Sequence, residues 1–68
     1  MDELGRKLKE LRKEKGWSQA KVAARLPIDR STYCRYEQGL VEPPLFICRM
    51  LCTVLDTTPN ALLGWDEK

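Results

Sequence analysis

The sequence predicts an all-α fold, with five short helices in one small domain. Apolar side chains recur three and four residues apart along most of the chain, which is the spacing of one face of a helix. Glycine or proline stands at the boundaries between these segments, and no segment alternates apolar and polar side chains as a strand does. A chain of 68 residues has room for a single domain. We expect that domain to span 1–68, with helices at about 2–15, 18–25, 29–38, 44–55 and 59–63 and a tail at 64–68.

The first helix is indicated by Leu4, Leu8 and Leu11, which fall on one stripe while charged residues fill the other faces. Gly16 ends it, because glycine adopts at little cost the left-handed conformation that closes a helix. Two lysines precede this glycine, where cations stabilise the carbonyl end of a helix.

The second and third helices are separated by a proline. Ser18 can cap the start of the second helix, although the lysine three residues further on cannot complete a reciprocal capping box. Pro27 ends this helix, because the residue before a proline disfavours the helical conformation. Asp29 then caps the third helix, which ends at Gly39.

Prolines also introduce the fourth and fifth helices. Pro43 and Pro44 precede an apolar stripe, and Thr58-Pro59 combines an N-cap with a proline in the first helical position. Gly64 ends the last helix. The stripe of the fourth helix consists of Leu45, Cys48, Leu51, Cys52 and Leu55.

The composition excludes several classes of protein. Three cysteines are an odd number, which argues against a closed disulfide framework, and the absence of histidine excludes His-dependent catalysis and most zinc sites. No apolar run approaches the roughly 20 residues that a membrane span needs, and Met1-Asp2-Glu3 does not resemble the start of a signal peptide. We therefore expect a soluble cytoplasmic protein that is not an enzyme, with no catalytic residues, metal, cofactor, small-molecule ligand or membrane contact.

The charges are distributed unevenly along the chain. Residues 1–35 hold ten Lys/Arg and five Asp/Glu, a net +5, whereas residues 36–68 hold two and five, a net −3. A basic half beside an acidic half indicates a surface that faces a polyanion, with nucleic acid as the first candidate. A well-solvated first helix would explain the same asymmetry equally well.

The third helix has an outer face suited to DNA. Arg30 and Cys34, and Ser31 and Arg35, are pairs four residues apart on the side opposite the tyrosines. Arginine can bridge guanine O6 and N7, and small hydroxyl groups contact several bases in the major groove. Taken alone, this helix is better explained as a solvated surface that happens to carry arginines.

The order of the elements strengthens the DNA interpretation. A short helix, a tight turn and a helix held by two tyrosines have the spacing of a helix-turn-helix motif. Glu37 shares the inward face of the third helix with the tyrosines. The expected core of this motif is Val22, Ala23, Leu26, Ile28, Tyr33 and Tyr36.

These motifs together resemble one known family. From Leu4 to Gly64 the chain is similar to the phage-repressor type (XRE-type, lambda-repressor-like) of helix-turn-helix DNA-binding domain. The similarity lies in the joint order of KGWSQAKVAARLPIDRSTYCRYEQG, EPPLFI and LDTTPNALLG. The resemblance implies a compact five-helix domain of bacterial or phage type that binds operator DNA with its third helix in the major groove.

The resemblance also implies particular DNA contacts. Base contacts would come from Arg30, Ser31, Thr32 and Arg35. Backbone contacts would come from Gln19, Ser18, Lys21 and Arg12.

The family further implies an ion pair between Arg12 and Glu37 beneath the DNA-facing surface. The residues support this pair on their own terms. Arg12 borders the apolar stripe of the first helix and Glu37 faces inward from the third, and either charge would be costly to bury alone.

We therefore expect a transcriptional regulator, most simply a repressor, that binds double-stranded DNA as a homodimer on a two-fold symmetric operator. Two departures from the family pattern bear on this expectation. Pro27 stands where glycine is common, which indicates a reshaped turn. Leu40 and Val41 stand where Lys or Arg is common. This apolar pair leaves open an alternative, a protein-interaction module of the same fold that binds a partner regulator or toxin.

The cysteines and tryptophans have plainer explanations. Cys48 and Cys52 are expected as buried thiols, since a metal site would need more ligands, and Cys34 as a bystander on the DNA face and not a redox switch. Trp17 is expected to pack against the first helix, and Trp65 either on the core or in a subunit interface.

Overall fold

The computed structural model describes residues 2–63, with five helices and, within those residues, no strand. This confirms the predicted all-α fold. The end of every helix lies within one residue of its predicted position. The helices are α1 (Asp2–Glu14), α2 (Gln19–Ala24), α3 (Arg30–Gln38), α4 (Leu45–Val54) and α5 (Pro59–Leu63). The predicted stop at Gly64 and the tail with Trp65 lie outside the described residues.

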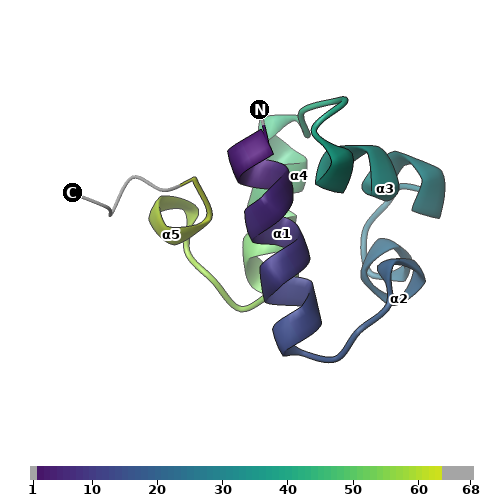
Figure 1. The fold of residues 1–68 in the computed structure, drawn as a ribbon, viewed down its shortest axis with the longest axis horizontal. Coiled ribbons are helices and arrows are strands. Elements are labelled where there is room, and N and C mark those ends of the chain that lie inside the picture. Colours follow the sequence, from purple (N-terminus) through teal and green to yellow (C-terminus); the bar gives the residue numbers. More distant parts are fainter. Residues whose placement is uncertain (1, 64–68) are drawn as a thin grey trace.

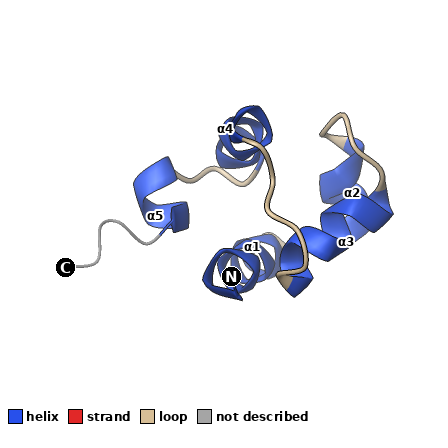
Figure 2. Ribbon diagram, turned by 90° about the horizontal axis from the view of Figure 1, so that it is seen from above, coloured by secondary structure: helices blue, strands red, loops and turns tan. Residues whose placement is uncertain are grey.

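Helix α1 lies across the middle of the molecule and contacts both ends of the fold. Figure 1 shows α2 and α3 on one side of α1 and α5 on the other. The view from above in Figure 2 places α4 across from α1, above it and apart from the α2–α3 pair. The core fills the space between these helices, and its fully buried side chains are Leu8, Val22, Tyr33, Ile47, Leu51 and Leu62.

Helix α1 packs tightly against the end of α3 at Gly5. This glycine is buried, and a Cβ atom there would lie 2.8 Å from the carbonyl oxygen of Tyr36 and closer still to that of Glu37. Since real Cβ atoms do not come so near to a carbonyl oxygen, the two helices can pack at this distance only because residue 5 has no side chain.

Three helices end in the same backbone arrangement, with one residue in the left-handed conformation. Gly16 closes α1 with φ 72°, Gly39 closes α3 with φ 76°, and Asp56 follows α4 with φ 59°. In each case the N–H of the next residue donates to the carbonyl five positions earlier, at 3.2, 3.1 and 2.8 Å respectively. The two glycine stops were predicted, whereas the aspartate was not.

The N-termini of three helices are capped as predicted. Ser18, Asp29 and Thr58 each accept a hydrogen bond from the backbone N–H three residues further on, at 3.1, 2.9 and 3.1 Å. Helix α4 differs, because Pro44 is its N-cap and makes no side-chain hydrogen bond.

The turn between α2 and α3 accommodates Pro27 without distortion of either helix. Helix α2 ends at Ala24, and the N–H groups of Arg25 and Leu26 donate back to the last turn of α2, each at 3.0 Å. Pro27 has no N–H, so it ends this series of bonds without leaving a donor unpaired. Helix α3 starts afresh at Arg30, and the chain between the two helices is therefore a turn, as a helix-turn-helix motif requires.

The motif packs largely as predicted. Five of its six expected core residues are buried, and Ile28 is partly buried against them. The rings of Tyr33 and Tyr36 meet edge to face, with centroids 6.4 Å apart and an interplanar angle of 83°. Among the described helices, none is long and apolar enough to cross a membrane.

Candidate nucleic-acid interface

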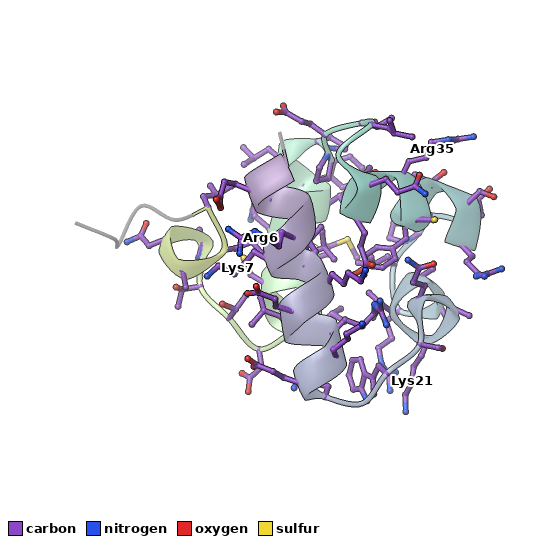
Figure 3. All side chains as sticks on the ribbon, in the orientation of Figure 1. Arg6, Lys7, Lys21 and Arg35 are labelled. Carbon is purple, nitrogen blue, oxygen red and sulfur yellow. The ribbon has the colours of Figure 1, made fainter. Side chains whose placement is uncertain are left out.

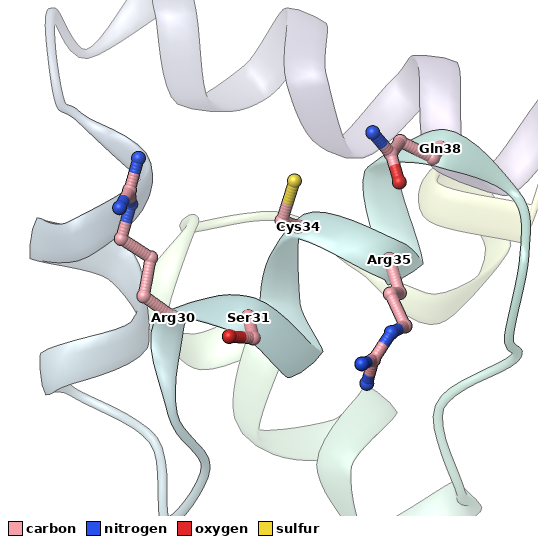
Figure 4. Close-up of a pocket in the computed structure, with 5 residues that line it drawn as sticks. All are labelled: Arg30, Ser31, Cys34, Arg35 and Gln38. Atoms are coloured by element: carbon pink, nitrogen blue, oxygen red, sulfur yellow. The ribbon is translucent and has the colours of Figure 1, made fainter.

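The outer face of α3 carries a shallow hollow of about 310 Å³. Figure 4 shows Arg30 and Arg35 on either side of Ser31 and Cys34, with Gln38 further along the helix. Arg30, Ser31 and Arg35 are exposed, and Cys34 is partly buried. The structure thus brings three of the four predicted base-contacting residues to one surface.

Thr32, the fourth predicted base-contacting residue, does not line this hollow. It is partly buried in the first turn of α3, and its backbone N–H donates to Asp29 Oδ1 at 2.9 Å. Hydrogen bonding with the Thr32 side chain, and then with its backbone N–H, holds the pKa of Asp29 below its usual range. By capping α3, the Asp29 carboxylate fixes where this helix starts and therefore the direction in which the side chains of α3 project.

The two arginines of this face are not engaged in ion pairs with described residues. The ion pairs found in residues 2–63 involve Arg6, with two glutamates of α1, and Arg12. Arg30 and Arg35 therefore present charged donors to solvent. They lie five residues apart on the exposed side of α3, and the guanidinium of each has the fork of N–H donors that can bind phosphate or guanine.

A buried polar network lies beneath the motif. Arg12 donates from Nε to Glu37 Oε2 at 2.6 Å and from Nη2 to Glu37 Oε1 at 3.1 Å, and its Nη1 donates to the carbonyl of Trp17 at 2.8 Å. Gln19 Nε2 donates to Glu37 Oε1 at 3.0 Å. One carboxylate therefore joins α1, α3 and the first residue of α2.

This network corrects one expectation. The predicted ion pair between Arg12 and Glu37 is present, but Arg12 was also expected to contact the DNA backbone. Its side chain is only 10% exposed, and all three guanidinium nitrogens donate inside the protein. Arg12 therefore holds helices together and does not face a phosphate.

The protonation of the network follows from its geometry. Burial alone would raise the pKa of Glu37, but the hydrogen bonds and charge of Arg12, together with the neighbouring Tyr33 and Gln19, outweigh burial and lower it. Burial, together with the nearby Glu37 carboxylate, raises the pKa of the Tyr33 hydroxyl. Glu37 is therefore ionised and Tyr33 neutral at ordinary pH. The Tyr33 hydroxyl is buried with no hydrogen-bond partner among the described residues.

The corner between α1 and α2 forms a second basic surface. Trp17 is partly buried against the core, and its ring is surrounded by three cations: Lys15 Nζ at 5.3 Å, Lys21 Nζ at 5.1 Å and Arg25 Cζ at 4.9 Å from the ring centroid. Figure 3 shows Lys21 at one end and Arg35 at the other end of the side formed by α2 and α3. Ser18 and Lys21, both predicted backbone contacts, are exposed at this corner.

Comparison with known proteins identifies the family. Residues 3–63 match the model of a helix-turn-helix domain. The chain belongs to this family. The match covers all five helices except the first residue of α1.

Two relatives of this helix-turn-helix domain come from Bacillus subtilis (strain 168). One is the HTH-type transcriptional regulator AnsR, 44% identical over 62 residues that make up 91% of this chain and 53% of the relative. The other is the SPbeta prophage-derived uncharacterized HTH-type transcriptional regulator YonR, 39% identical over 59 residues, 87% of this chain and 55% of the relative. The chain thus spans about half the length of either relative. No solved structure gave a significant match.

The loop that follows α3, outside the helix-turn-helix motif, carries no basic side chain. Leu40 is 69% exposed and Val41 46% exposed, and the next residue is the exposed Glu42. This loop presents apolar side chains and a carboxylate to solvent, which is a poor surface for phosphate.

The cysteines of the helix-turn-helix domain occupy ordinary positions. Cys52 is buried and Cys48 partly buried, and burial raises the pKa of both thiols. No group of three potential metal ligands lies together among the described residues. The interactions that sequence reasoning missed are the three cations around Trp17 and the bond from Gln19 to Glu37. A basic side chain four residues after Trp17 in α2 was the available signal for the first, whereas nothing local indicates the second.

Proposed function

We propose that this chain is a sequence-specific DNA-binding transcriptional regulator that inserts α3 into the major groove. The observation that carries the proposal is the exposed pair Arg30 and Arg35 on α3, beside Ser31. Neither arginine has a carboxylate partner among the described residues. Helix α3 is the second helix of the helix-turn-helix motif in this domain. Two relatives named as transcriptional regulators support it.

We propose a role for each residue of this surface, and their positions support these roles. Arg30, Ser31 and Arg35 contact bases, with Thr32 at the edge of this set, and Ser18, Gln19 and Lys21 contact the DNA backbone. Gln19 would be oriented for that contact by its bond to Glu37. Such a regulator acts in the cytoplasm on double-stranded DNA, without catalysis, cofactor or small-molecule ligand.

A single domain of this size makes few base contacts. We therefore propose that it binds as a homodimer on a two-fold symmetric operator whose half-sites lie about 34 Å apart, and that it represses by occluding a promoter. Selection of binding sites from random duplex DNA tests this. Enrichment of an inverted repeat supports it, and failure to enrich any sequence contradicts it.

Matched arginine variants sharpen the experiment. Arg30→Ala and Arg35→Ala should each cost about 1–3 kcal/mol in binding and relax the preference at one base position. Arg6→Ala removes the same charge from an exposed site on α1, where Arg6 is bound to Glu3 and Glu10, and should change neither affinity nor preference appreciably. An equal loss on every sequence would reassign Arg30 or Arg35 to phosphate contact.

The exposed apolar loop favours a second candidate, a protein-interaction module that binds a partner regulator or toxin. Salt dependence separates the two candidates. Contacts with phosphate release counterions, so a DNA complex should weaken steeply as salt is raised. If Arg30→Ala and Arg35→Ala leave function intact while Leu40→Ser and Val41→Ser abolish it, the interaction module is the better account.

A further inference from the structure

Three cations gather around one aromatic ring at the junction of α1 and α2. Lys15 Nζ, Lys21 Nζ and Arg25 Cζ lie 5.3, 5.1 and 4.9 Å from the centroid of the Trp17 ring. All three cationic side chains are exposed, whereas Trp17 is partly buried against the core. These four residues are called the Trp17 corner below. Because a cation is attracted to the negative face of an indole, the ring holds three flexible side chains in one place.

The positive charge of the Trp17 corner is not balanced within the part of the chain that the structure describes. Residues 15–28 contain three cations and no Asp or Glu. None of the three cations takes part in an ion pair with a described residue. Like charges held this close repel one another, and an aromatic ring has no net charge with which to neutralise them. The corner therefore offers an anion three charged donors at once.

The ring that gathers these cations is fixed in position by Arg12. The backbone N–H of Trp17 donates to the Arg12 carbonyl at 3.2 Å, and the Trp17 carbonyl accepts a hydrogen bond from Arg12 Nη1 at 2.8 Å. Arg12 in turn binds Glu37 of α3. The Trp17 ring therefore has a set place relative to the helix-turn-helix motif, and the cations on the ring share that placement.

The position of the corner beside the motif indicates its partner. In a helix-turn-helix, the second helix enters the major groove while the first crosses the DNA backbone. Lys21 lies in α2 and Arg25 directly follows it, four residues apart and so on one side of that first helix. Figure 3 shows Lys21 and Arg35 at opposite ends of the side formed by α2 and α3. A DNA backbone that α2 crosses would therefore pass the Trp17 corner.

We propose that the Trp17 corner binds consecutive phosphates of the DNA backbone, and that Trp17 is a positioning residue that holds Lys15, Lys21 and Arg25 for this contact. Each cation keeps the ring on one side and donates N–H groups to phosphate oxygens on the other. Since the ring already restricts the three side chains, less conformational entropy is lost when DNA binds. The inference rests on the proposed function and deepens it, because it extends the backbone contact of Lys21 to two further cations and gives Trp17 a role in binding.

A purely structural role fits the corner less well. Cation–π contacts that served only to hold the turn between α1 and α2 would add to a turn that Gly16 already closes in the left-handed conformation. One cation on the ring would supply such a contact without the repulsion that three cations introduce. The unbalanced charge is instead what a surface for a polyanion requires.

The test is the salt dependence of binding to a labelled duplex of arbitrary sequence, measured by fluorescence anisotropy between about 50 and 200 mM salt. Phosphate contacts carry no sequence information, so the duplex need not contain an operator. Lys15→Gln, Lys21→Gln and Arg25→Gln should each reduce the slope of log affinity against log salt by about 1. The triple variant should reduce it by about 2–3.

A matched variant controls for the loss of charge. Lys7→Gln makes the same change on the side of α1 that faces α5 in Figure 3, away from Lys21, and should leave the slope unchanged. The three cations of the corner are exposed, so their variants should keep the helical circular dichroism of wild type. A triple variant with the wild-type slope overturns the phosphate contact, whether or not its stability has changed.

Substitution of the ring tests the positioning role separately. Trp17→Leu keeps every charge, so the slope should stay close to wild type while the affinity falls about threefold to tenfold at each salt concentration. Trp17→Phe retains a weaker aromatic face and should lose only about twofold. If Trp17→Leu does not fold by circular dichroism, Trp17→Phe decides the point. An affinity equal to or above that of wild type in the folded variants overturns the positioning role of Trp17.

The outcome is separable from that of the DNA-binding proposal. A chain that enriches an operator, but whose triple variant keeps the wild-type slope, overturns the Trp17 corner alone. A chain that enriches no sequence, but whose triple variant loses slope on the arbitrary duplex, overturns sequence-specific binding and leaves the corner standing. A chain that binds no duplex at about 50 mM salt overturns both.

Discussion

Arg12 of α1 and Glu37 of α3 form a two-point ion pair, with Nε–Oε2 at 2.6 Å and Nη2–Oε1 at 3.1 Å. Their side chains are 10% and 3% exposed. A pair so placed is not primarily a source of net stability, because desolvation of two charges offsets most of their attraction. Its effect is to fix how α1, α2 and α3 meet, since the same carboxylate also binds Gln19.

Replacing Arg12 alone should lower the stability of the fold much more than replacing Arg12 and Glu37 together. Arg12→Met should destabilise the fold by about 3–5 kcal/mol, because it leaves Glu37 buried without its cation, and in a domain this small that is most of the stability. Arg12→Met with Glu37→Leu should recover a large part of the loss. Urea denaturation followed by circular dichroism measures both. If the double variant is no more stable than Arg12→Met, the uncompensated charge is not the cause.

The pair should also make the fold sensitive to acid. The pKa of Glu37 is lowered in the folded protein relative to the unfolded chain, where it is about 4.3. Its contribution to stability is therefore fully present above the unfolded pKa and is lost as pH falls through the folded pKa. The free energy of unfolding should drop from about pH 5 downward.

A matched glutamine series checks this assignment. Glu37→Gln should flatten the acid limb of the stability curve, whereas Glu14→Gln at an exposed site of α1 should leave the wild-type shape. Asp29, whose pKa is also lowered by its cap hydrogen bonds, adds to the same limb in all three proteins. An acid limb of equal steepness in Glu37→Gln and wild type would rule out the buried pair as its source.

Much of the fold could be predicted because the signals for helix ends are local in sequence. Gly16, Gly39, Ser18 and Asp29 act on backbone groups within a few residues, so a single stretch of chain contains the whole cause. Asp56 shows the limit of this approach. It adopts the left-handed conformation that glycine usually supplies, and nothing in its neighbourhood marks it out.

The site was less predictable, because it depends on helices that meet in space. The outward face of α3 follows from helical periodicity, so Arg30, Ser31 and Arg35 could be assigned together. The two roles expected of Arg12 could not be separated by sequence, since a cation at the edge of an apolar stripe can turn either way. The structure shows that the Arg12 side chain points inward, because it forms a short ion pair with Glu37.

Gly5 should be intolerant of even one added methyl group. In an exposed helix, Gly→Ala stabilises by roughly 1 kcal/mol, because alanine loses less backbone entropy. At Gly5 the added Cβ would lie 2.8 Å from the carbonyl oxygen of Tyr36, which cannot move without shifting α3. We expect Gly5→Ala to destabilise the fold by about 1–3 kcal/mol. Thermal unfolding measures it, with Lys9→Ala as the control on the exposed side of α1.

Tyr33 should tolerate the loss of its hydroxyl. Its side chain is fully buried, and the hydroxyl makes no hydrogen bond of good geometry to a described residue, although it lies near the Glu37 carboxylate. The folded state therefore recovers little of the desolvation cost of this polar group. Tyr33→Phe should therefore leave stability unchanged or raise it by about 1 kcal/mol. Tyr33→Leu, which removes the ring, should cost several times that amount and also disturb the contact with Tyr36. Urea denaturation measures both variants. A loss of more than about 1 kcal/mol in Tyr33→Phe would show that the hydroxyl is bonded in solution. The Glu37 carboxylate, which already influences the pKa of Tyr33, is then the acceptor to test by the double variant.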